Sequence, residues 1–368
     1  MCDIDGVRQA SIRMSTAPPC PTVTLALFSY NQQDFIEEAV RSVLAQDCAP
    51  MEIIVSDDCS SDDTFGRARA VVESYSGPHR VQARRNETNL GLIPHVNLVM
   101  ELASGEIVVA AAGDDVSLPH RVRALLDARM RGDGKAVLFF SNAIVVDRDG
   151  KHRGPYLGNV DRRRWELRSM AQRGAAGNLG VTSSWDRRIF SVFGPIPEGV
   201  MAEDTVIAFR AALLGGIQYI EEPLVHYRLH GNNISLNSVE RVQDGRHLLQ
   251  LLRRGAAGNV ATSESNMRDL IRAHELGFYT ASELNELSGL IARHVAELRS
   301  EADMFDMGRL GRATIIVRHL ALGTRPRLVA RWILWFMLPD LYVRQLKVLR
   351  SYRVWRAHRN LEGVTHLS

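Results

Sequence analysis

Strand-like and helix-like segments alternate regularly through residues 22–141, and this alternation constrains the fold more than any other feature of the sequence. Five short apolar runs have the length and composition of strands: 22–28, 51–56, 80–84, 106–112 and 136–141. Four segments between them space their apolar residues as helices do: 34–46, 62–76, 92–103 and 118–131. Strands that alternate with such helices pair in parallel and carry helices on both faces of the sheet. The pattern predicts an α/β, doubly wound, mostly parallel sheet.

The regular pattern changes in the second half of the chain. A helix is expected at 202–214, short strands at 216–220 and 224–228, and a glycine-rich, loop-dominated stretch at 174–194. Beyond residue 239 the spacing becomes helical, so a helical C-terminal region follows the sheet. We therefore expect four parts: a loose N-terminal leader (1–20), an α/β domain (21–238), a helical region (239–324) and basic amphipathic C-terminal helices (325–368).

Positive charge is concentrated at one end of the chain. The formal net charge is +3, yet residues 325–359 hold nine basic residues against one acid, Asp340. This segment carries +8, which leaves −5 for the rest of the molecule. The distribution argues against a nucleic-acid-binding body and for a separate cationic surface at the C-terminus.

Large apolar side chains accompany the basic ones in residues 330–359, and Pro339 divides this stretch into two helical pieces. Trp and Tyr beside Arg suit the boundary of a membrane, where each basic residue contributes about 1 kcal/mol near an anionic leaflet. The alternative is a cationic helical pair that packs on the α/β domain or at a dimer contact. The sequence leaves the oligomeric state open.

A cytoplasmic protein, peripheral on the inner face of the cell membrane, is expected from the remaining features. The first ten residues include two aspartates and lack the pattern of a signal peptide. No run reaches the roughly 18 apolar residues of a membrane span. The four cysteines show no metal-binding spacing and are expected to be reduced.

The turn after the first strand excludes two large classes of nucleotide-binding enzyme. Ligands of such sheets bind beyond the carboxyl ends of the strands, and here the chain leaves the first strand through residues 28–32. This turn contains neither the glycine pattern of dinucleotide-dependent oxidoreductases nor that of a P-loop.

Paired acidic residues stand at three positions where a ligand would lie. They are Asp57-Asp58 after the second strand, Asp114-Asp115 after the fourth, and Glu203-Asp204 at the start of the helix at 202–214. Carboxylates gathered at one edge repel each other, and a divalent cation with oxygen ligands would neutralise them. The alternative is that such pairs merely form turns. It is weaker for Asp114-Asp115, which follow a long apolar run.

Other acids are expected to serve the fold alone. Asp62 and Asp63 are expected to cap the helix at 62–76. Asp34, with Glu37 three residues later, has the spacing of a capping box at the start of the helix expected at 34–46.

Eight motifs, in order, resemble the family-2 glycosyltransferases of the GT-A fold over residues 22–235. They are Ser29-Tyr30-Asn31, SVLAQ (42–46), IIVSDDCSSDDT (53–64), RNETNLG (85–91), ASGEIVVAAAGDD (103–115) with LPHR (118–121), Phe193-Gly194-Pro195, Glu203-Asp204 and EPLVHYRLHGNNIS (222–235). The resemblance implies a metal-dependent, inverting glycosyltransferase that uses a nucleotide-sugar donor.

The first strand ends supply the nucleotide site in this resemblance. Ser29, Tyr30 and Asn31 would line the pocket for the base and ribose. Asp57 would accept a hydrogen bond from the imide N–H of the base, with Asp58 in support.

The resemblance also implies a metal site. Asp114 would lie near the ribose, and Asp115 would bind Mg²⁺ or Mn²⁺ on the diphosphate, where the metal acts as a Lewis acid. His230 would approach the metal or the diphosphate, unless it is a histidine packed in a loop. Arg228 would contact phosphate oxygens or form an ion pair with Glu221 or Glu222.

Asp204 matches the family's catalytic base, which takes the proton of the acceptor hydroxyl as that oxygen attacks the anomeric carbon. Glu203 would contact the acceptor or hold the base. A single displacement inverts the anomeric configuration. The implied donor is a UDP-sugar, and the implied acceptor is a glycan or lipid-linked hydroxyl in cell-surface polysaccharide synthesis.

One departure from the family pattern leaves an alternative open. The family often has an aspartate two positions before Asp114, where this chain has Ala112. The second interpretation is therefore a catalytically weak or inactive subunit that binds a nucleotide sugar or a glycan.

Overall fold

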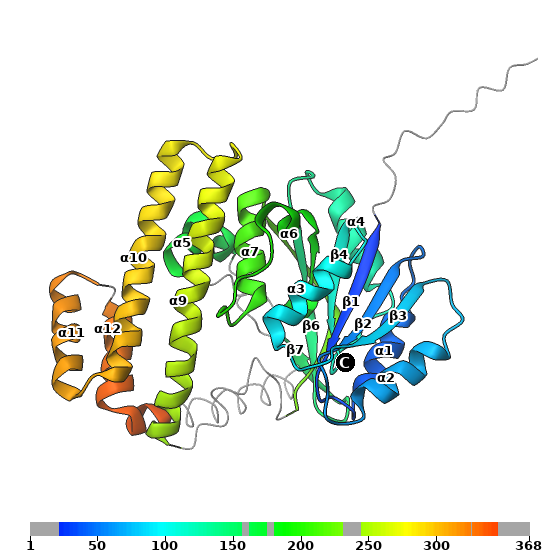
Figure 1. The fold of residues 1–368 in the computed structure, drawn as a ribbon, viewed down its shortest axis with the longest axis horizontal. Helices are drawn as coiled ribbons and strands as arrows, with labels where there is room; N and C mark the ends of the chain where they lie inside the picture. The colour runs from blue at the N-terminus through cyan, green and yellow to red at the C-terminus, as the bar shows by residue number, and fades with distance from the viewer. Residues whose placement is uncertain (1–21, 157–161, 175–179, 231–243, 325, 345–368) are drawn as a thin grey trace, which may run out of the picture.

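The computed structural model describes residues 22–156, 162–174, 180–230, 244–324 and 326–344 (Figure 1). The strands are β1 (Val23–Ser29), β2 (Glu52–Asp57), β3 (Arg80–Arg85), β4 (Ile107–Ala112), β5 (Val116–Ser117), β6 (Leu138–Val146), β7 (His152–Pro155), β8 (Ser183–Asp186) and β9 (Ile217–Arg228). The helices of the α/β part are α1 (Ile36–Leu44), α2 (Thr64–Glu73), α3 (Leu92–Leu102), α4 (Arg121–Arg131), α5 (Leu167–Arg173), α6 (Arg188–Phe193) and α7 (Glu203–Leu214).

The strands form one mixed sheet in the order β3-β2-β1-β4-β8-β6-β9-β5, with β7 paired to β6. Strands β1 to β4 pair in parallel, as expected, and so do β6 and β9. Strand β8 runs antiparallel to both β4 and β6, and β5 runs antiparallel to β9. The α/β class is confirmed, although the pairing is more mixed than the sequence indicated.

Helices cover both faces of the sheet, because alternate strand residues point to opposite sides. Leu25 and Ile53 pack under α1, α2 and α4, whereas Ala26 and Ile54 pack under α3, α6 and α7. Both layers are visible around the strands in Figure 1. All four of these strand residues are fully buried. This packing fixes the carboxyl ends of β1, β2 and β4 side by side.

Two expectations for the second half of the α/β part were wrong in detail. The stretch at 174–194 is not dominated by loops, because it contains β8, in the middle of the sheet, and α6. The two short strands expected near residue 220 are one strand, β9, whose pairing with β6 shifts register near Asn142. Pro223, which lacks a backbone N–H, lies at that irregularity.

A helical region packs against the α/β part. It comprises α9 (Gly245–Glu275), α10 (Ala281–Asp306), α11 (Arg309–Ala321), α12 (Pro326–Trp332) and a π-helical turn, η3 (Ile333–Met337). Figure 1 shows α9 and α10 as a long hairpin beside α5 and α7. Leu270 of α9 and Ile291 of α10 belong to the same core as Val206 of α7, so the two parts share one apolar interior. Among the described helices, none is long and apolar enough to cross a bilayer.

The apolar residues expected to contact a membrane are largely enclosed by protein. Trp332, Trp335 and Phe336 are buried in a second core with Met304 of α10 and Ile316 of α11. These side chains pack within the helical region, on α10 and α11, and not on the α/β domain as the alternative expected. Residues 345–368, with five of the nine basic residues, lie outside the described part of the chain, as does the N-terminal leader.

The expected helix caps differ from the sequence pattern. Asp34 caps nothing: α1 begins two residues later, and the Asp34 carboxylate pairs with Arg148 at 2.5 Å. Asp62, rather than Asp63, accepts from the backbone N–H of Thr64 at 3.0 Å at the start of α2. Asp63 instead lies 3.4 Å from Arg67 one turn later.

Candidate active site at the carboxyl edge of the sheet

The loops after β1 and β2 are joined by hydrogen bonds at the edge of the sheet. The backbone N–H of Asn31 donates to Oγ of Ser60 at 2.9 Å, and the Asn31 side chain accepts from the N–H of Ser61 at 2.8 Å. Asn31 has φ 52°, a conformation that Asn tolerates better than most residues. Tyr30, between Ser29 and Asn31, is 46% exposed. This places an aromatic ring in solvent at the position expected to contact a base.

Asp57 ends β2 and is completely buried. One carboxylate oxygen accepts from the backbone N–H of Ser60 at 2.8 Å, and the guanidinium of Arg85 lies 3.6 Å away. Ser29 Oγ lies 3.4 Å from the other oxygen. The carboxylate is thus oriented by its own loop, and its role toward a base remains a prediction.

Asp58 has a structural role that the sequence did not indicate. Its carboxylate accepts hydrogen bonds from the side chain of Asn86 at 2.7 Å and from the backbone N–H groups of Leu90 and Gly91, both at 2.9 Å. These three donors belong to the loop between β3 and α3. Asp58 therefore fixes that loop, and this explains why RNETNLG lies beside the strand edge.

Cys59 occupies a left-handed backbone conformation, with φ 59°. A side chain with a Cβ costs about 1–2 kcal/mol there, whereas glycine does not. We expect Cys59→Gly to stabilise the fold by about 1 kcal/mol, measured by urea denaturation. Cys48→Gly, at the other described cysteine, serves as the control and should not stabilise. A loss of stability in Cys59→Gly would show that the left-handed conformation of Cys59 does not strain the backbone.

The fourth strand ends in the second acidic pair. Gly113 permits close approach of the loop after β1, since a Cβ there would lie 2.9 Å from Cβ of Ser29. Asp114 and Asp115 follow and are 8% and 5% exposed. Burial raises the pKa of Asp115 well above its ordinary value, and the charge of Asp114 raises it further. Asp115 is therefore a carboxylate whose charge is poorly stabilised by the protein alone.

The strand β9 supplies the residues that face this pair. The backbone N–H of Arg228 donates to Asp115 Oδ1 at 2.7 Å, and its guanidinium pairs with Glu38 at 2.6 Å. The expected partners Glu221 and Glu222 are not used by Arg228. His230 Nε2 lies 2.8 Å from Asp114 Oδ2, and its ring packs on Phe35 at 4.6 Å between centroids.

These groups fit a divalent cation that takes most of its ligands from a substrate. The described residues contain no cluster of three or more His, Cys, Asp or Glu side chains arranged for a metal. Mg²⁺, however, is commonly held by one or two carboxylates together with substrate phosphates. Buried Asp115, beside Asp114, meets that need. His230 already contacts Asp114, so its role as a metal ligand stays a prediction.

The third acidic pair opens α7. Burial raises the pKa of Glu203 to about 8, and the neighbouring charge of Asp204 contributes to this shift. Burial also raises the pKa of Asp204, to about 6, while hydrogen bonds from Thr205 hold it lower than that of Glu203. Two acids with separated pKa values can take separate roles. Both acids hold their protons more tightly than ordinary carboxyls, and the pair titrates near neutral pH.

Glu203→Gln is expected to make the folding stability of the protein less sensitive to a rise in pH. Because the folded-state pKa of Glu203 is about 8 rather than 4.5, folding takes up a proton between these values. Stability therefore falls as pH rises through this window, and glutamine removes that loss. The melting temperature of the variant relative to wild type should increase from pH 5 to pH 8 in scanning fluorimetry. A constant difference would contradict the raised pKa.

Arg121 connects the second and third acidic pairs. It is fully buried, and burial lowers its pKa to about 10, although the charge of Asp115 opposes this effect. Its guanidinium donates to the carbonyls of Ala110 in β4 and Val181, both at 2.7 Å. Val181 follows Gly180, where a Cβ would lie 3.4 Å from Cβ of Asp204. Arg121 therefore holds the backbone that contacts the expected base.

Tyr156 is a second residue that sequence reasoning missed. Burial and the charge of Asp204 raise its pKa, so its hydroxyl stays protonated near this acid. Its ring contacts Tyr227 at 5.8 Å, one residue before Arg228. No sequence pattern marked Tyr156, whereas Arg121 stands in the LPHR motif and could have been singled out.

Most predicted residues thus meet at one region of the molecule. Ser29 and Asp57 end the neighbouring strands β1 and β2 in register, and Asp114 comes two residues after the end of β4. Asp115 and Asp204 connect through Arg121 and the backbone at 180–181. The arrangement brings together the carboxyl ends of three strands, a buried aspartate pair and an acid pair with raised pKa values.

Comparison with known proteins finds similarity to glycosyltransferases. Residues 24–181 match the family model described as glycosyl transferase family 2. An uncharacterized glycosyltransferase of Nostoc is 25% identical over 233 residues, which cover 60% of this chain and 69% of that protein. The succinoglycan biosynthesis protein ExoO of Rhizobium meliloti is 33% identical over 132 residues, which cover 36% of each chain.

A solved mannosyltransferase from Pyrobaculum calidifontis, in complex with GDP-Man and Mn²⁺, is 19% identical to this chain. The alignment covers 89% of this chain and 86% of that one, with a TM-score of 0.47. That score is too low to transfer its ligands to this protein.

The α/β sheet, the acidic strand ends and the matched segment together define a glycosyltransferase. Residues 24–181 are similar to glycosyltransferase family 2.

Proposed function

We propose that this protein transfers a sugar, with inversion, from a nucleoside diphosphate donor to an acceptor hydroxyl. The observation that carries the proposal is the acid pair at the start of α7, in which Asp204 has a pKa of about 6 and Glu203 one of about 8. A general base works best when its pKa lies near the working pH. Asp204 meets that condition.

The proton moves to Asp204 as the acceptor oxygen attacks the anomeric carbon. The bond from this carbon to the donor diphosphate breaks on the opposite side, and the nucleoside diphosphate leaves with the electron pair. Glu203 stays protonated at neutral pH and can donate a hydrogen bond to the acceptor or to Asp204. Tyr156 can donate in the same way.

The donor would lie along the carboxyl ends of β1, β2 and β4. Ser29, Tyr30 and Asn31 would contact the base and ribose, and buried Asp57 would accept from the base; uridine is the base we propose. Asp115, with Asp114, would hold Mg²⁺ or Mn²⁺. When bound, this cation supplies a Lewis acid toward the diphosphate.

The test is a thermal-shift panel of UDP, GDP and their sugars, with and without Mn²⁺, followed by an assay of diphosphate release. A ligand that binds only the folded state raises its melting temperature. We expect UDP with Mn²⁺ to give the largest rise, and release to require an acceptor. Binding without release would favour the weakly active binding subunit suggested by Ala112. The absence of both binding and release would refute the proposal.

A glycan or lipid-linked acceptor is the second part of the proposal. The relative named for succinoglycan biosynthesis supports a role in polysaccharide synthesis, and the cavity described in the next subsection bears on the acceptor itself.

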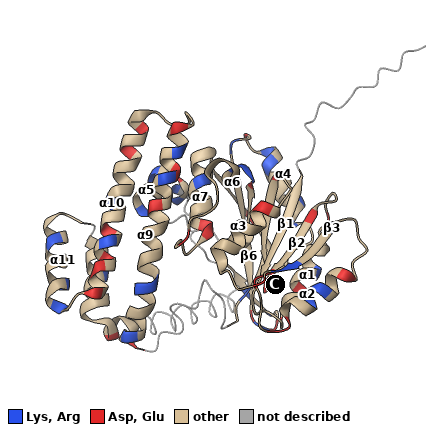
Figure 2. Cartoon of the chain, viewed as in Figure 1, with Lys and Arg blue, Asp and Glu red and all other residues tan. Residues whose placement is uncertain are grey.

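We also propose contact with an anionic membrane surface, now through α11. Helix α11 contains three arginines and no acidic residue, and Figure 2 shows it with basic residues alone. Leu310, Val317 and Leu320 are exposed, and their spacing places them on one helix face. The surface thus combines exposed apolar groups with cations.

Co-sedimentation with phosphatidylglycerol vesicles should show binding that weakens at high salt. Val317→Glu should lower the bound fraction several-fold, whereas Leu276→Glu, at an exposed apolar residue next to α9, should not. Equal binding to uncharged vesicles would contradict a role for the arginines.

A further inference from the structure

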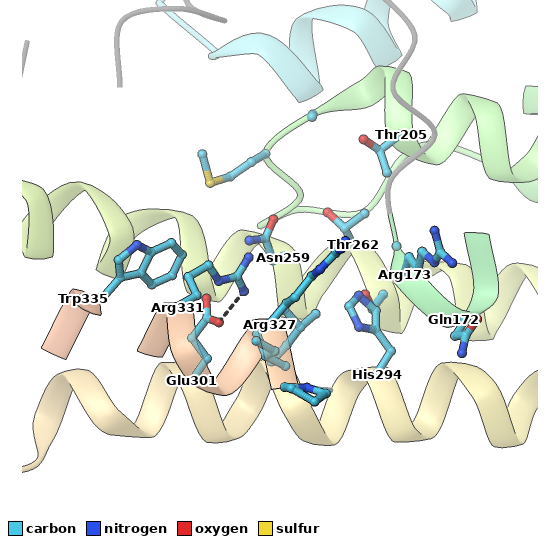
Figure 3. A pocket seen from close by; sticks show the side chains of 17 residues that line it. Gln172, Arg173, Thr205, Asn259, Thr262, His294, Glu301, Arg327, Arg331 and Trp335 are labelled. Atoms are coloured by element: carbon cyan, nitrogen blue, oxygen red, sulfur yellow. Dashed lines mark hydrogen bonds and ion pairs between the residues drawn. The ribbon is translucent and has the colours of Figure 1, made fainter. Parts of the chain in front are cut away.

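A cavity of about 930 Å³ lies between the helical region and the α/β part (Figure 3). Its walls come from α5 and the start of α7 on one side, and from α9, α10, α12 and η3 on the other. Thr205 lines it and is the residue next to Asp204, whose Oδ1 lies 3.4 Å from Thr205 Oγ1. The cavity therefore adjoins the proposed base.

The charged side chains of this cavity are mainly positive. Arg173, Arg327 and Arg331 line it, with Glu301 as the one acid in the lining. Glu301 accepts from Arg331 at 2.9 Å, the contact dashed in Figure 3, and from the indole N–H of Trp332 at 2.6 Å. Arg173 and Arg327 have no carboxylate partner among the described residues. Both residues are exposed, and two cations without acidic partners beside the cavity favour an anion.

Two buried polar atoms of the lining also lack partners. Nδ1 of His294 and Nε1 of Trp335 make no hydrogen bond within the described part of the chain, although the two residues are only 9% and 8% exposed. Oε2 of Glu297 lies 3.9 Å from Nδ1 of His294, beyond hydrogen-bond distance. Buried polar groups are normally satisfied. Both residues line the cavity, so its wall contains polar groups that the described protein leaves unsatisfied.

Apolar side chains complete the wall. Met201, Leu298 and Leu328 line the cavity together with the ring of Trp335. Figure 3 shows Arg327 between Arg331 and His294, so the cations lie within the same recess as the apolar side chains. A ligand that joins an anionic group to an apolar surface, such as a sugar face or an isoprenoid chain, matches both parts.

We propose that this cavity binds the phosphate group of the acceptor, so that the acceptor is a sugar esterified to phosphate. The inference rests on the proposed transferase function and names the acceptor of that same site. Phosphate suits guanidinium groups, which donate two hydrogen bonds in a planar fork. The acceptor phosphate is unchanged in the reaction: its sugar hydroxyl gains the transferred sugar, and the hydroxyl proton goes to Asp204.

The binding test uses geranyl diphosphate as probe, titrated calorimetrically into the full chain with the donor site saturated by UDP. The double variant Arg173→Gln/Arg327→Gln should bind the probe at least ten-fold more weakly than wild type. Arg69→Gln/Arg123→Gln, at exposed arginines of α2 and α4 outside the cavity, serves as the matched control and should bind it normally. Unchanged affinity in the double variant would overturn the proposal, and so would geraniol binding as tightly as its diphosphate.

Transfer assays distinguish the two sources of this chemistry. The same sugar is offered as a methyl glycoside, as a sugar 1-phosphate and linked to geranyl diphosphate. Preference for the lipid-linked form alone assigns a lipid-linked acceptor, and preference for both phosphorylated forms assigns a soluble phosphate ester. In either case the double variant should lose the preference. Equal use of all three would overturn the proposal.

Failure of the cavity proposal can be distinguished from failure of the transferase proposal. If UDP binds and sugar is transferred regardless of Arg173 and Arg327, the cavity assignment falls and the transferase remains. If geranyl diphosphate binds through these arginines in a protein that binds no nucleotide, the transferase proposal falls and the anion site remains.

Discussion

Asp204→Asn is expected to lower the rate of sugar transfer by about 10²–10⁴-fold, the usual contribution of a general base. The asparagine side chain keeps the shape of Asp204 and cannot accept the proton of the acceptor hydroxyl. The measurement is release of nucleoside diphosphate from the donor in the presence of acceptor. In wild type this rate should rise with pH through about 6, as Asp204 loses its proton.

Donor affinity in Asp204→Asn should equal that of wild type, because the nucleotide is expected at the strand ends and not at α7. Asp303→Asn, at an exposed aspartate of α10, serves as the control and should keep full activity. Normal turnover by Asp204→Asn would refute the assignment of the base. Loss of UDP binding in this variant would show instead that the change had disturbed the donor site.

Arg210→Met is expected to destabilise the fold by about 3–5 kcal/mol, because it leaves a buried carboxylate without its partner. Arg210 of α7 is 1% exposed and donates to Asp269 of α9 at 2.8 Å. It also donates to the carbonyl of Gly194 at 2.7 Å. Burial raises the pKa of Asp269 even beside this guanidinium, so a lone Asp269 would be costly to bury. Urea denaturation measures the loss.

The double variant Arg210→Met/Asp269→Leu should recover much of that stability, since apolar residues can replace a buried ion pair at little cost. The single variant Asp269→Leu, which leaves the guanidinium unpaired, should be nearly as unstable as Arg210→Met. Additive losses in the double variant would show that the two side chains act independently.

Local patterns were sufficient to predict the first half of the sheet. Strands β1 to β4 lie within two residues of the expected ranges, because each is a short apolar run between amphipathic helices. Asp57 and Asp114 were placed at one edge for the same reason, since parallel strands end at the same side. The family resemblance supplied the roles of Asp115 and Asp204, which periodicity alone could not.

The remaining features depend on contacts between distant segments. Strand β8 is only four residues long and becomes a strand by pairing with β4 and β6. Arg228 could pair with several acids near it in sequence, but folding brings Glu38 to it, 190 residues away. Trp332 and Trp335 have the composition of a membrane-facing segment, and only the packing of α10 and α11 shows that they are enclosed.

Helix α7 joins the candidate active site to the helical region of the molecule. Asp204 stands in its first turn, and Arg210, about 9 Å further along the axis, is locked to α9. A displacement of the α9–α10 hairpin would therefore be transmitted to the position of the base. Helix α7 therefore connects the proposed base Asp204 to α9, whose residues line the cavity.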